Sequence, residues 1–334
     1  IILFLTLSLN AYSSSLCKNG DAPFEINMPW GKKFKCADGS TPKAKELNEK
    51  PTSLYPSNNK GSTLGITKLI AGPNKNCVIK SKQIHCWGRD SELPDEIKGL
   101  KNVTDIAIGA EHFCAISDDK IHCWGKNRFG QFNYPNIKNI KSIEAGSFHT
   151  CAMTDSNIYC WGMKQHNLLN VPKLNKPHKL TIGPNGYSTC AIDMDGVKCW
   201  GANYSKQLKV PKGFDMIDDI YSGSRFHCAN KSNKITCWGA KKTIRVAPSP
   251  NQLKTLKSLS FGERHSCGIN EQGIFCTGDN KFGQTKYPKN LKDPISISVG
   301  TAHSCVLASN GVACWGLNSN DQTDVPNHLF QSMN

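Results

Sequence analysis

The sequence lacks a long apolar run of the kind that forms a transmembrane helix, which takes about 20 consecutive apolar residues. The apolar stretch at residues 1–9 is too short for that, and small and polar residues follow it at positions 10–15. This order is typical of the core and cleavage region of a secretory signal peptide. We predict that residues 1–15 are a signal peptide with a truncated start, because neither Met nor a basic leader precedes them. A buried N-terminal strand is the alternative.

The sequence also lacks the common motifs of catalysis and cofactor binding. It has no nucleophile elbow, phosphate-cradling glycine loop, His-Glu-x-x-His metal site or EF-hand loop. Two acidic pairs occur, Asp118-Asp119 in a predicted hairpin turn and Asp218-Asp219 near a predicted strand start, where solvated carboxylates are ordinary. We therefore predict neither an enzyme nor a bound cofactor or metal.

Acidic residues are scarce relative to basic ones. The chain has 41 Lys and Arg against 26 Asp and Glu, a net charge of +15. This excess favours anionic partners such as acidic proteins, envelope glycans or lipid headgroups. The lysines are spread along the chain, so a solvated surface is the simpler interpretation. Nucleic acid is not a predicted partner of an exported chain without a recognised binding motif. We expect a monomer that does not span a membrane, although contact with a membrane surface stays open.

Cysteine, in contrast, is abundant and ordered. Sixteen cysteines behind an export signal predict a disulfide framework. We pair Cys17 with Cys36. The other fourteen form seven pairs, each nine positions apart, and successive first cysteines lie 37–39 residues apart. That period is typical of solenoids and propellers. The seven predicted pairs are Cys77 with Cys86, Cys114 with Cys123, Cys151 with Cys160, Cys190 with Cys199, Cys228 with Cys237, Cys267 with Cys276, and Cys305 with Cys314.

Each cysteine pair is expected to bridge a β-hairpin. Residues 103–135 show the pattern: short alternating runs bounded by Gly, Asp or Pro, which predict three or four strands per period. Positions nine apart lie opposite each other across a hairpin, with Cα atoms about 4.5 or 5.5 Å apart, within the range of a disulfide. At the last turn position stand Gly196, Gly273, Gly311 and Asn157, where we expect a left-handed backbone.

Histidine and tryptophan recur within the repeat. His112, His149, His265 and His303 each stand two residues before a cysteine. Zinc is the alternative, but its paired ligands favour shorter spacing. We predict structural histidines that bond backbone groups where strands converge. Six tryptophans lie in Cys-Trp-Gly triplets, where we predict packing between neighbouring blades. They are Trp87, Trp124, Trp161, Trp200, Trp238 and Trp315; the sixth unit has Cys276-Thr277-Gly278 instead.

The full pattern is Gly-x-x-His-x-Cys-Ala, a turn, then Cys-Trp-Gly-x-Asn-x-x-Gly-Gln and a closing Pro. With it, the chain resembles the regulator of chromosome condensation repeat family from about Gly65 onward. The best matches are residues 124–131, 278–284 and 316–326, whereas residues 89–94 and 240–245 depart from the pattern. The resemblance implies an all-β, seven-bladed β-propeller with one disulfide-stapled hairpin per blade. The short period is similar to that of bacterial secreted members, including a propeller-type β-lactamase inhibitor.

We predict three regions: the signal peptide at residues 1–15, a disulfide-bonded segment and linker at 16–64, and the propeller at 65–334. Residues 37–64 are expected to be mostly irregular. The segment around Phe24, Met28, Trp30 and Phe34 is expected to pack against a blade, with a small cap on the propeller or a docking element as the alternatives.

The predicted function is secreted, non-enzymatic recognition of a protein or anionic glycan through propeller loops. Variation concentrates between the Cys-Trp-Gly triplet and the closing Pro, and loops on a rigid scaffold commonly carry binding. The candidate binding surface is Tyr134, Tyr204, Lys206, Phe282 and Tyr287. A secreted inhibitor of a hydrolase such as a β-lactamase is one alternative. A hydrolase or lyase with its site in the central channel is another.

Overall fold

The computed structural model describes residues 24–28, 31–35, 65–241 and 246–329. The chain divides into two compact units, residues 1–59 and 60–334. In the first unit, β1 (Phe24–Met28) and β2 (Gly31–Lys35) form an antiparallel hairpin. The predicted signal peptide, the bridge between Cys17 and Cys36 and the linker lie outside the described residues, and they stay predictions.

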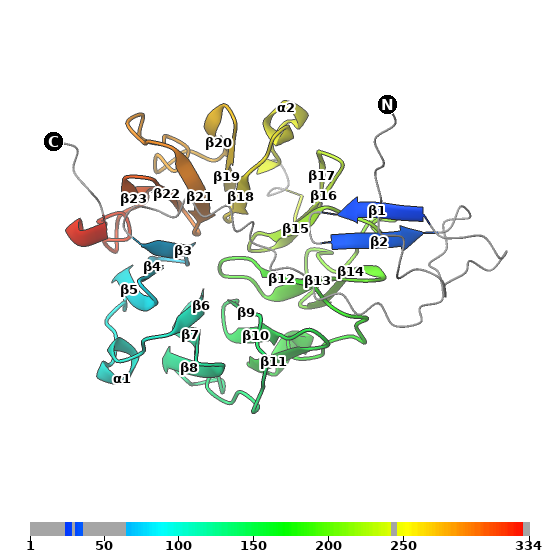
Figure 1. Ribbon diagram of the computed structural model, residues 1–334, viewed down its shortest axis with the longest axis horizontal. Coiled ribbons are helices and arrows are strands. Elements are labelled where there is room, and N and C mark those ends of the chain that lie inside the picture. Colours follow the sequence, from blue (N-terminus) through cyan, green and yellow to red (C-terminus); the bar gives the residue numbers. More distant parts are fainter. Residues whose placement is uncertain (1–23, 29–30, 36–64, 242–245, 330–334) are drawn as a thin grey trace, which may run out of the picture. The chain divides into compact units, whose positions relative to one another are not determined.

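The second unit consists of seven antiparallel sheets of three strands, one per repeat, arranged as a ring (Figure 1). The inner strands are β3 (Ile66–Ala71), β6 (Val103–Ile108), β9 (Ser142–Ala145), β12 (Lys179–Ile182), β15 (Asp219–Ser222), β18 (Ser258–Phe261) and β21 (Pro294–Val299). The middle strands are β4 (Lys75–Lys80), β7 (His112–Ser117), β10 (His149–Met153), β13 (Ser188–Asp193), β16 (Phe226–Lys231), β19 (His265–Asn270) and β22 (His303–Ala308). The outer strands are β5 (Gln83–Gly88), β8 (Lys120–Gly125), β11 (Ile158–Gly162), β14 (Gly196–Gly201), β17 (Lys234–Gly239), β20 (Gly273–Gly278) and β23 (Gly311–Gly316).

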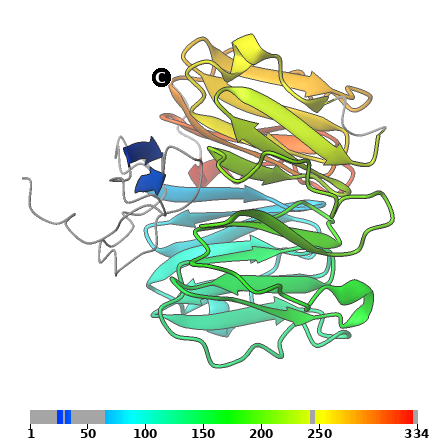
Figure 2. The same cartoon turned by 90° about the vertical axis from the view of Figure 1, so that its right-hand side faces the viewer.

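This architecture is the predicted seven-bladed β-propeller. Seen from the side, the strands run across the thickness of the ring (Figure 2). Among the residues that the structure describes, four short helical turns lie in the connections: α1 (Asp95–Lys98), η1 (Gln165–Asn167), α2 (Pro250–Leu253) and η3 (Asn327–Leu329). Within the described ranges, no helix is long and apolar enough to cross a membrane.

All seven disulfides predicted for the propeller are present, and each joins the middle and outer strands of one blade. They are Cys77 with Cys86, Cys114 with Cys123, Cys151 with Cys160, Cys190 with Cys199, Cys228 with Cys237, Cys267 with Cys276, and Cys305 with Cys314. The two cysteines of each pair lie directly opposite each other in the register. The predicted pairing is therefore confirmed in every blade.

The bridged cysteines differ from the expectation in one respect. Their Cα atoms lie 4.0–4.1 Å apart, closer than the predicted 4.5 or 5.5 Å.

Closing a loop of about ten residues stabilises a hairpin by about 2–3 kcal/mol in the chain-entropy model. Seven such bridges indicate an oxidising compartment.

The hairpin turns are of several kinds. The backbone is left-handed at Gly196, Gly273 and Gly311, with φ of 120°, 114° and 124°, as predicted. The prediction for Asn157 is wrong, since its φ is not positive. Its turn is longer: Met153 pairs with Ile158, and the four residues between them are held by hydrogen bonds between Thr154 and Asn157.

We number the blades 1 to 7 in chain order, from the sheet of β3 to the sheet of β21. The apolar core lies between blades rather than within them. Each hydrophobic cluster combines residues of two neighbouring blades; that between blades 1 and 2 holds Ile79 and Ile84 from one, and Phe113 and Trp124 from the other. All six tryptophans of the triplets are buried, which confirms their predicted packing role. Because no single sheet buries a core by itself, stability depends on the joints between blades.

Blades approach most closely where the inner strand ends in glycine. A Cβ on Gly183 would lie 2.1 Å from the carbonyl oxygen of Gly223, the equivalent residue of the next blade. Likewise, a Cβ on Gly300 would lie 2.3 Å from the carbonyl oxygen of Gly72. A glycine directly after the inner strand therefore allows this close backbone packing around the ring.

The ring closes between blade 7 and blade 1 without a shared strand among the described residues. Every sheet is built from one continuous stretch of chain. Ser298 accepts a hydrogen bond from the Ala71 N–H at 2.8 Å, and the Gln322 carbonyl accepts from the Asn76 side chain at 2.7 Å. Side-chain hydrogen bonds and apolar packing thus close the ring in place of strand pairing.

Candidate functional site

One side of the propeller carries two loops from every blade. The first joins the inner and middle strands, and the second follows the outer strand; we call them inner and outer loops, and the side that carries them the loop face. In each blade the first outer-loop residue donates its N–H to an inner-loop carbonyl at 2.8–3.0 Å. These donors and acceptors are Arg89 to Asn74, Lys126 to Glu111, Met163 to Phe148, Ala202 to Tyr187, Ala240 to Arg225, Asp279 to Arg264, and Leu317 to Ala302.

The regular outer loops are folded by their own side chains. In blade 2, the Asn127 carboxamide oxygen accepts from the Phe132 N–H at 2.9 Å, and the buried Gln131 accepts from the Phe129 N–H at 2.8 Å. The same two bonds recur in blades 4, 6 and 7. The Asn-x-x-Gly-Gln motif is therefore a structural frame. The two residues after the Asn form its tip, and the first of them is exposed in all four loops.

The frame also joins each regular outer loop to the next blade. The indole N–H of Trp161 donates to the Gln131 carbonyl at 2.8 Å, and Trp87, Trp238 and Trp315 bond the equivalent Gln carbonyls. The loops of blades 1 and 3 have no Gln at this position, and the buried indole nitrogens that follow, of Trp124 and Trp200, find no hydrogen-bond partner among the described residues.

The four predicted histidines belong to the joints between blades. Each bonds a side chain of the next blade through Nε2, at 2.7–3.0 Å, whereas the prediction named backbone partners. The pairs are His112 with Thr150, His149 with Thr189, His265 with Ser304, and His303 with Asn76. His265 also has a hydrogen bond with the backbone of His303, as predicted.

A fifth joint uses the same bond with the partners exchanged. Here Ser188 takes the histidine position, and His227 of the next blade supplies Nε2 at 2.9 Å. The zinc alternative has no free ligand set in the described ranges. The one group of three potential ligands there is Cys190, Cys199 and His227, and its two sulfur atoms form a disulfide.

Burial holds these five histidines neutral. It lowers the pKa of His112, His227 and His303 to about 3, and that of His149 and His265 to about 4. A neutral imidazole serves a hydrogen bond between two packed blades because no charge is buried. We interpret these side chains as structural.

Two joints lack the histidine bond. In blade 1, Lys75 takes the histidine position; its buried ammonium lies 4.4 Å from the centre of the Phe113 ring, and burial lowers its pKa to about 8. In blade 5 the position is Phe226, which packs edge-on against Phe261 of blade 6. The contact at this joint is therefore apolar, whereas the equivalent contact at the five joints with a histidine bond is polar.

A row of aromatic rings crosses the loop face from blade 2 to blade 4. Its neighbouring ring centres are 5.0–6.2 Å apart, and it ends at Tyr204, whose hydroxyl lies 2.5 Å from His166 Nδ1. Tyr204 is 77% exposed and Phe129 38%. We call these five residues the aromatic row: Phe129, Phe148, Tyr187, His166 and Tyr204.

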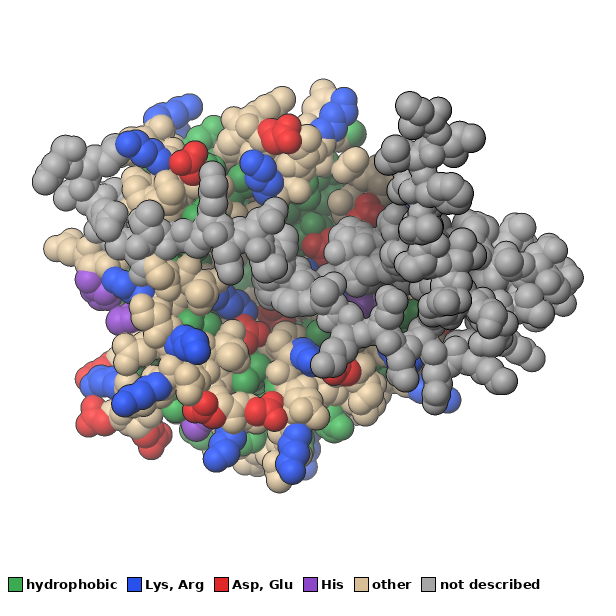
Figure 3. Space-filling model, in the orientation of Figure 1, with side chains coloured by type: hydrophobic (Ala, Val, Ile, Leu, Met, Phe, Trp, Pro, Cys, Tyr) green, Lys and Arg blue, Asp and Glu red, His purple; other side chains and the backbone are tan. Residues whose placement is uncertain are grey.

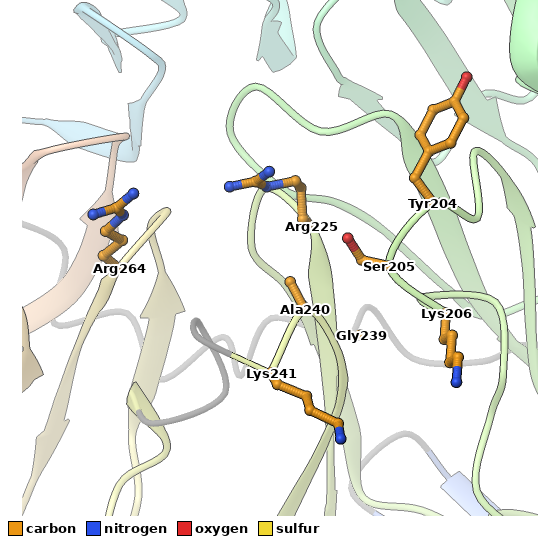
Figure 4. A pocket seen from close by; sticks show the side chains of 8 residues that line it. All are labelled: Tyr204, Ser205, Lys206, Arg225, Gly239, Ala240, Lys241 and Arg264. Carbon is orange, nitrogen blue, oxygen red and sulfur yellow. The ribbon is translucent and has the colours of Figure 1, made fainter.

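A basic pocket of about 520 Å³ adjoins the end of this row. Figure 4 shows Arg225 extending toward Arg264, while Lys206 and Lys241 both point to one side of the cavity. Elsewhere basic side chains are spread among acidic ones, as the space-filling view shows for one side of the molecule (Figure 3). The residues that line this basic pocket are Tyr204, Ser205, Lys206, Arg225, Gly239, Ala240, Lys241 and Arg264.

The structure brings together two of the five predicted surface residues, since Tyr204 and Lys206 line the basic pocket. Phe282 is exposed at the equivalent tip of blade 6. Tyr134 and Tyr287 lie beyond the loop tips: the first is 38% exposed and packs edge-on against Trp161, and the second is half-buried beside Trp315. These two side chains contribute to the joints between blades.

The inner loops carry surface residues that the sequence predictions missed. Phe148, Tyr187, Arg225 and Arg264 each stand directly before the histidine position, where the residue varies from blade to blade between constant neighbours. That contrast is the same signal that singled out the outer loops. It was available from the sequence once the motif had been aligned.

Ionisable residues of the inner strands mostly pair with each other. Lys68 contacts Asp105, which also accepts from the Ile143 N–H at 3.0 Å, and Lys179 lies 3.0 Å from Asp219. Burial raises the pKa of the nearby Glu144 to about 7. Burial also raises the pKa of Tyr221, on the inner strand β15.

A second pocket, of about 270 Å³, lies beside the outer strand of blade 1. It too adjoins a unit that departs from the repeat. Its lining residues are Gln83, Ile84, His85, Cys86, Leu93, Lys98, Pro326 and His328.

Comparison with known proteins agrees with this architecture. The family model described as regulator of chromosome condensation (RCC1) repeat matches residues 103–131, 140–167, 256–284 and 295–322. No curated protein matches the chain. Among solved structures, the CRINKLY WD40 ectodomain of the Arabidopsis thaliana receptor kinase ACR4 is 20% identical with a TM-score of 0.59, covering 77% of this chain and 97% of its own.

A second solved structure, Prp20p from Saccharomyces cerevisiae, is 16% identical with a TM-score of 0.58, covering 75% of this chain and 83% of its own. The yeast protein has also been solved bound to Kap60; that structure is 16% identical with a TM-score of 0.58, covering 87% of this chain and 90% of its own. At such identities the likeness shows the fold alone.

Proposed function

Because the chain belongs to the regulator of chromosome condensation (RCC1) repeat family, we propose that it is a non-enzymatic recognition module that binds another protein through its loop face. The observation that carries the proposal is the aromatic row beside the basic pocket. Tyrosine, phenylalanine and arginine are the residue types enriched at protein interfaces, where a few such side chains supply most of the affinity.

The rigidity of the frame supports the same proposal. The exposed tips stand on loops whose Asn and Gln side chains are already hydrogen-bonded, and each loop is joined to the next blade by a tryptophan. Such a surface loses little conformational freedom on binding. It serves recognition better than it serves catalysis, which needs reactive groups in a shared cavity.

Prp20p, one of the solved structures that share this fold, binds proteins. Prp20p was described together with its binding properties to Gsp1p and histones, and the yeast protein was solved bound to Kap60. We carry over only the use of a propeller for protein binding. Seven disulfides and the predicted signal peptide favour a partner in an exported compartment, and a hydrolase inhibited by this chain is an alternative class of partner there.

The test uses a double variant of the row, Phe129→Ala with Tyr187→Ala, and the control Tyr159→Ala. Tyr159 is also 38% exposed but lies on an outer strand away from the row. Affinity capture with the intact oxidised chain identifies a partner, and titration then measures each variant. We expect the row variant to bind roughly 30-fold or more weakly, the range for loss of interface hot spots. Equal affinity of both variants for the partner would reject this surface.

A further inference from the structure

We propose that the basic pocket receives an acidic segment of the partner protein, with several carboxylates spread along an extended chain. This inference rests on the proposed function and specifies the chemistry of the partner. It starts from where the pocket lies, which is the fifth unit, where the repeat departs from its pattern.

The departure changes the role of one side chain. In blade 2 the outer loop begins Lys126-Asn127, and the asparagine bonds back to the backbone of its own loop. In blade 5 the corresponding residues are Ala240 and Lys241. Lysine has no acceptor oxygen with which to bond a backbone N–H. Lys241 instead lies exposed at the pocket, so a frame position has become a cation.

Four loops contribute one cation each. Lys206 comes from the outer loop of blade 4, Lys241 from that of blade 5, Arg225 from the inner loop of blade 5 and Arg264 from that of blade 6. Glu263 lies 3.8 Å from Arg225 and 3.9 Å from Arg264, too far for strong pairing. Lys206 and Lys241 form no ion pair with any residue that the structure describes. The pocket therefore keeps a net positive charge.

The same charges are balanced elsewhere on the loop face. In blade 2, Glu111 lies 2.9 Å from Lys126 and 2.5 Å from Arg128, and hydrogen bonds from Arg128 and Lys126 lower its pKa to about 2. Blade 2 thus offers an aromatic tip whose cations are neutralised. The unbalanced cations lie at the other end of the aromatic row, where the electrostatic attraction for an anionic partner is strongest.

The exposure of the cations indicates the form of the ligand. Arg225 and Arg264 are 56% and 64% exposed, so each contact with an anion is screened by water and weak. A single phosphate or sulfate would meet few of them at once. Several carboxylates on one chain together bind more tightly than one alone. After the first carboxylate has bound, each further contact forms within the same complex. We favour a protein segment over a polysaccharide because the pocket is continuous with Tyr204 and the aromatic row.

The experiment measures binding of fluorescent oligo-glutamate to the intact oxidised chain by polarisation, at low and at physiological salt. Oligo-glutamine, inorganic phosphate and a dextran sulfate oligosaccharide are the comparison probes. The pocket variant carries two substitutions, Lys206→Gln and Lys241→Gln. The control variant also carries two, Lys120→Gln and Lys234→Gln. The control removes the same charge from exposed residues at the start of two outer strands, at the opposite ends of those strands from the loop face.

We expect oligo-glutamate to bind with marked salt dependence, and the pocket variant to weaken it about tenfold while the control changes it less than about twofold. Equal weakening by both variants would show attraction to the net charge alone, and would overturn the inference. Binding of dextran sulfate without oligo-glutamate would also overturn it, in favour of an anionic glycan.

The two proposals fail separately. If the captured partner depends on Phe129 and Tyr187 but not on Lys206 and Lys241, the proposed function stands and this inference is wrong. If the partner depends on neither set, both are wrong, whatever oligo-glutamate does.

Discussion

The joint between blades 2 and 3 and the joint between blades 5 and 6 use the same chain positions differently. In the first, His112 bonds Thr150 and Trp161 bonds the preceding outer loop. In the second, Phe226 packs against Phe261, and a threonine replaces the tryptophan. The regular joint is polar, neutral and closed, whereas the irregular joint is apolar inside and opens to the basic pocket at the loop face.

The difference teaches that this chain gains a site by giving up part of its repeat. At the second joint Thr277 and Ser266 both donate to the Val246 carbonyl, at 2.8 and 2.6 Å, and so replace the missing indole bond locally. The joint stays satisfied without the regular frame. The outer loop of blade 5 is then free to carry a cation in place of a structural asparagine.

The largest expected effect is acid unfolding through the regular joints. A folded-state pKa below the unfolded value of 6.5 means that the unfolded state binds more protons, so the stability that these histidines contribute is complete above about pH 6.5 and is lost as the pH falls toward their folded-state values of about 4 and 3. At pH 5 each of the five histidines removes about 2 kcal/mol, and together they approach the whole folding free energy of a typical domain.

Urea unfolding between pH 7.5 and pH 5 measures this loss. The double variant His112→Phe with Thr150→Val converts a regular joint to the apolar kind and should lower the pH slope by about one proton. An unchanged slope would mean that His112 titrates normally in the folded chain.

The next effect compares two disulfides. Replacing Cys151 and Cys160 of blade 3, or Cys267 and Cys276 of blade 6, by alanine should each cost about 2–3 kcal/mol. Blade 6 should then open locally at lower free energy, because its Thr277 buries less apolar area than the tryptophan of blade 3. Hydrogen exchange of β19 and β20 against β10 and β11 measures the difference. Equal protection in the two variants would show that the tryptophan adds little to blade stability.

Removing one hydroxyl from a regular joint should have a smaller effect. Thr150→Val leaves His112 Nε2 buried without its partner and should cost about 2 kcal/mol. Thr104→Val is the control, since Thr104 is exposed on an inner strand and should change stability by less than about 0.5 kcal/mol. Thermal unfolding at neutral pH measures both variants. Similar losses of stability would mean that the hydrogen bond between His112 and Thr150 contributes little.

The smallest effect should be a gain. Burial lowers the pKa of Lys75 from 10.5 to about 8, so the stability that the neutral form of this side chain contributes is complete above pH 10.5 and is lost as the pH falls toward 8. Lys75→Met should therefore stabilise the chain at pH 7 by about 1–2 kcal/mol, after loss of the cation–π contact with Phe113. The gain should disappear near pH 11. The exposed Lys101→Met serves as control, and a gain independent of pH would point to packing instead of charge.

Repetition is what the sequence by itself determined. Seven cysteine pairs at one spacing, such as Cys114 with Cys123, predicted the hairpins, the blade number and the bridges, since register and turn length follow from local geometry. The tryptophans were likewise assignable as packing residues, because a residue repeated in every blade must serve what the blades share.

Contacts between blades were decided only by the tertiary structure. His112 meets Thr150 across 38 residues, and Phe148 meets Tyr187 across a joint, in a geometry set by the rotation from one sheet to the next. No spacing in the chain encodes that rotation. The basic pocket is likewise assembled from four loops of three blades, so its cations were visible in the sequence only as isolated charges.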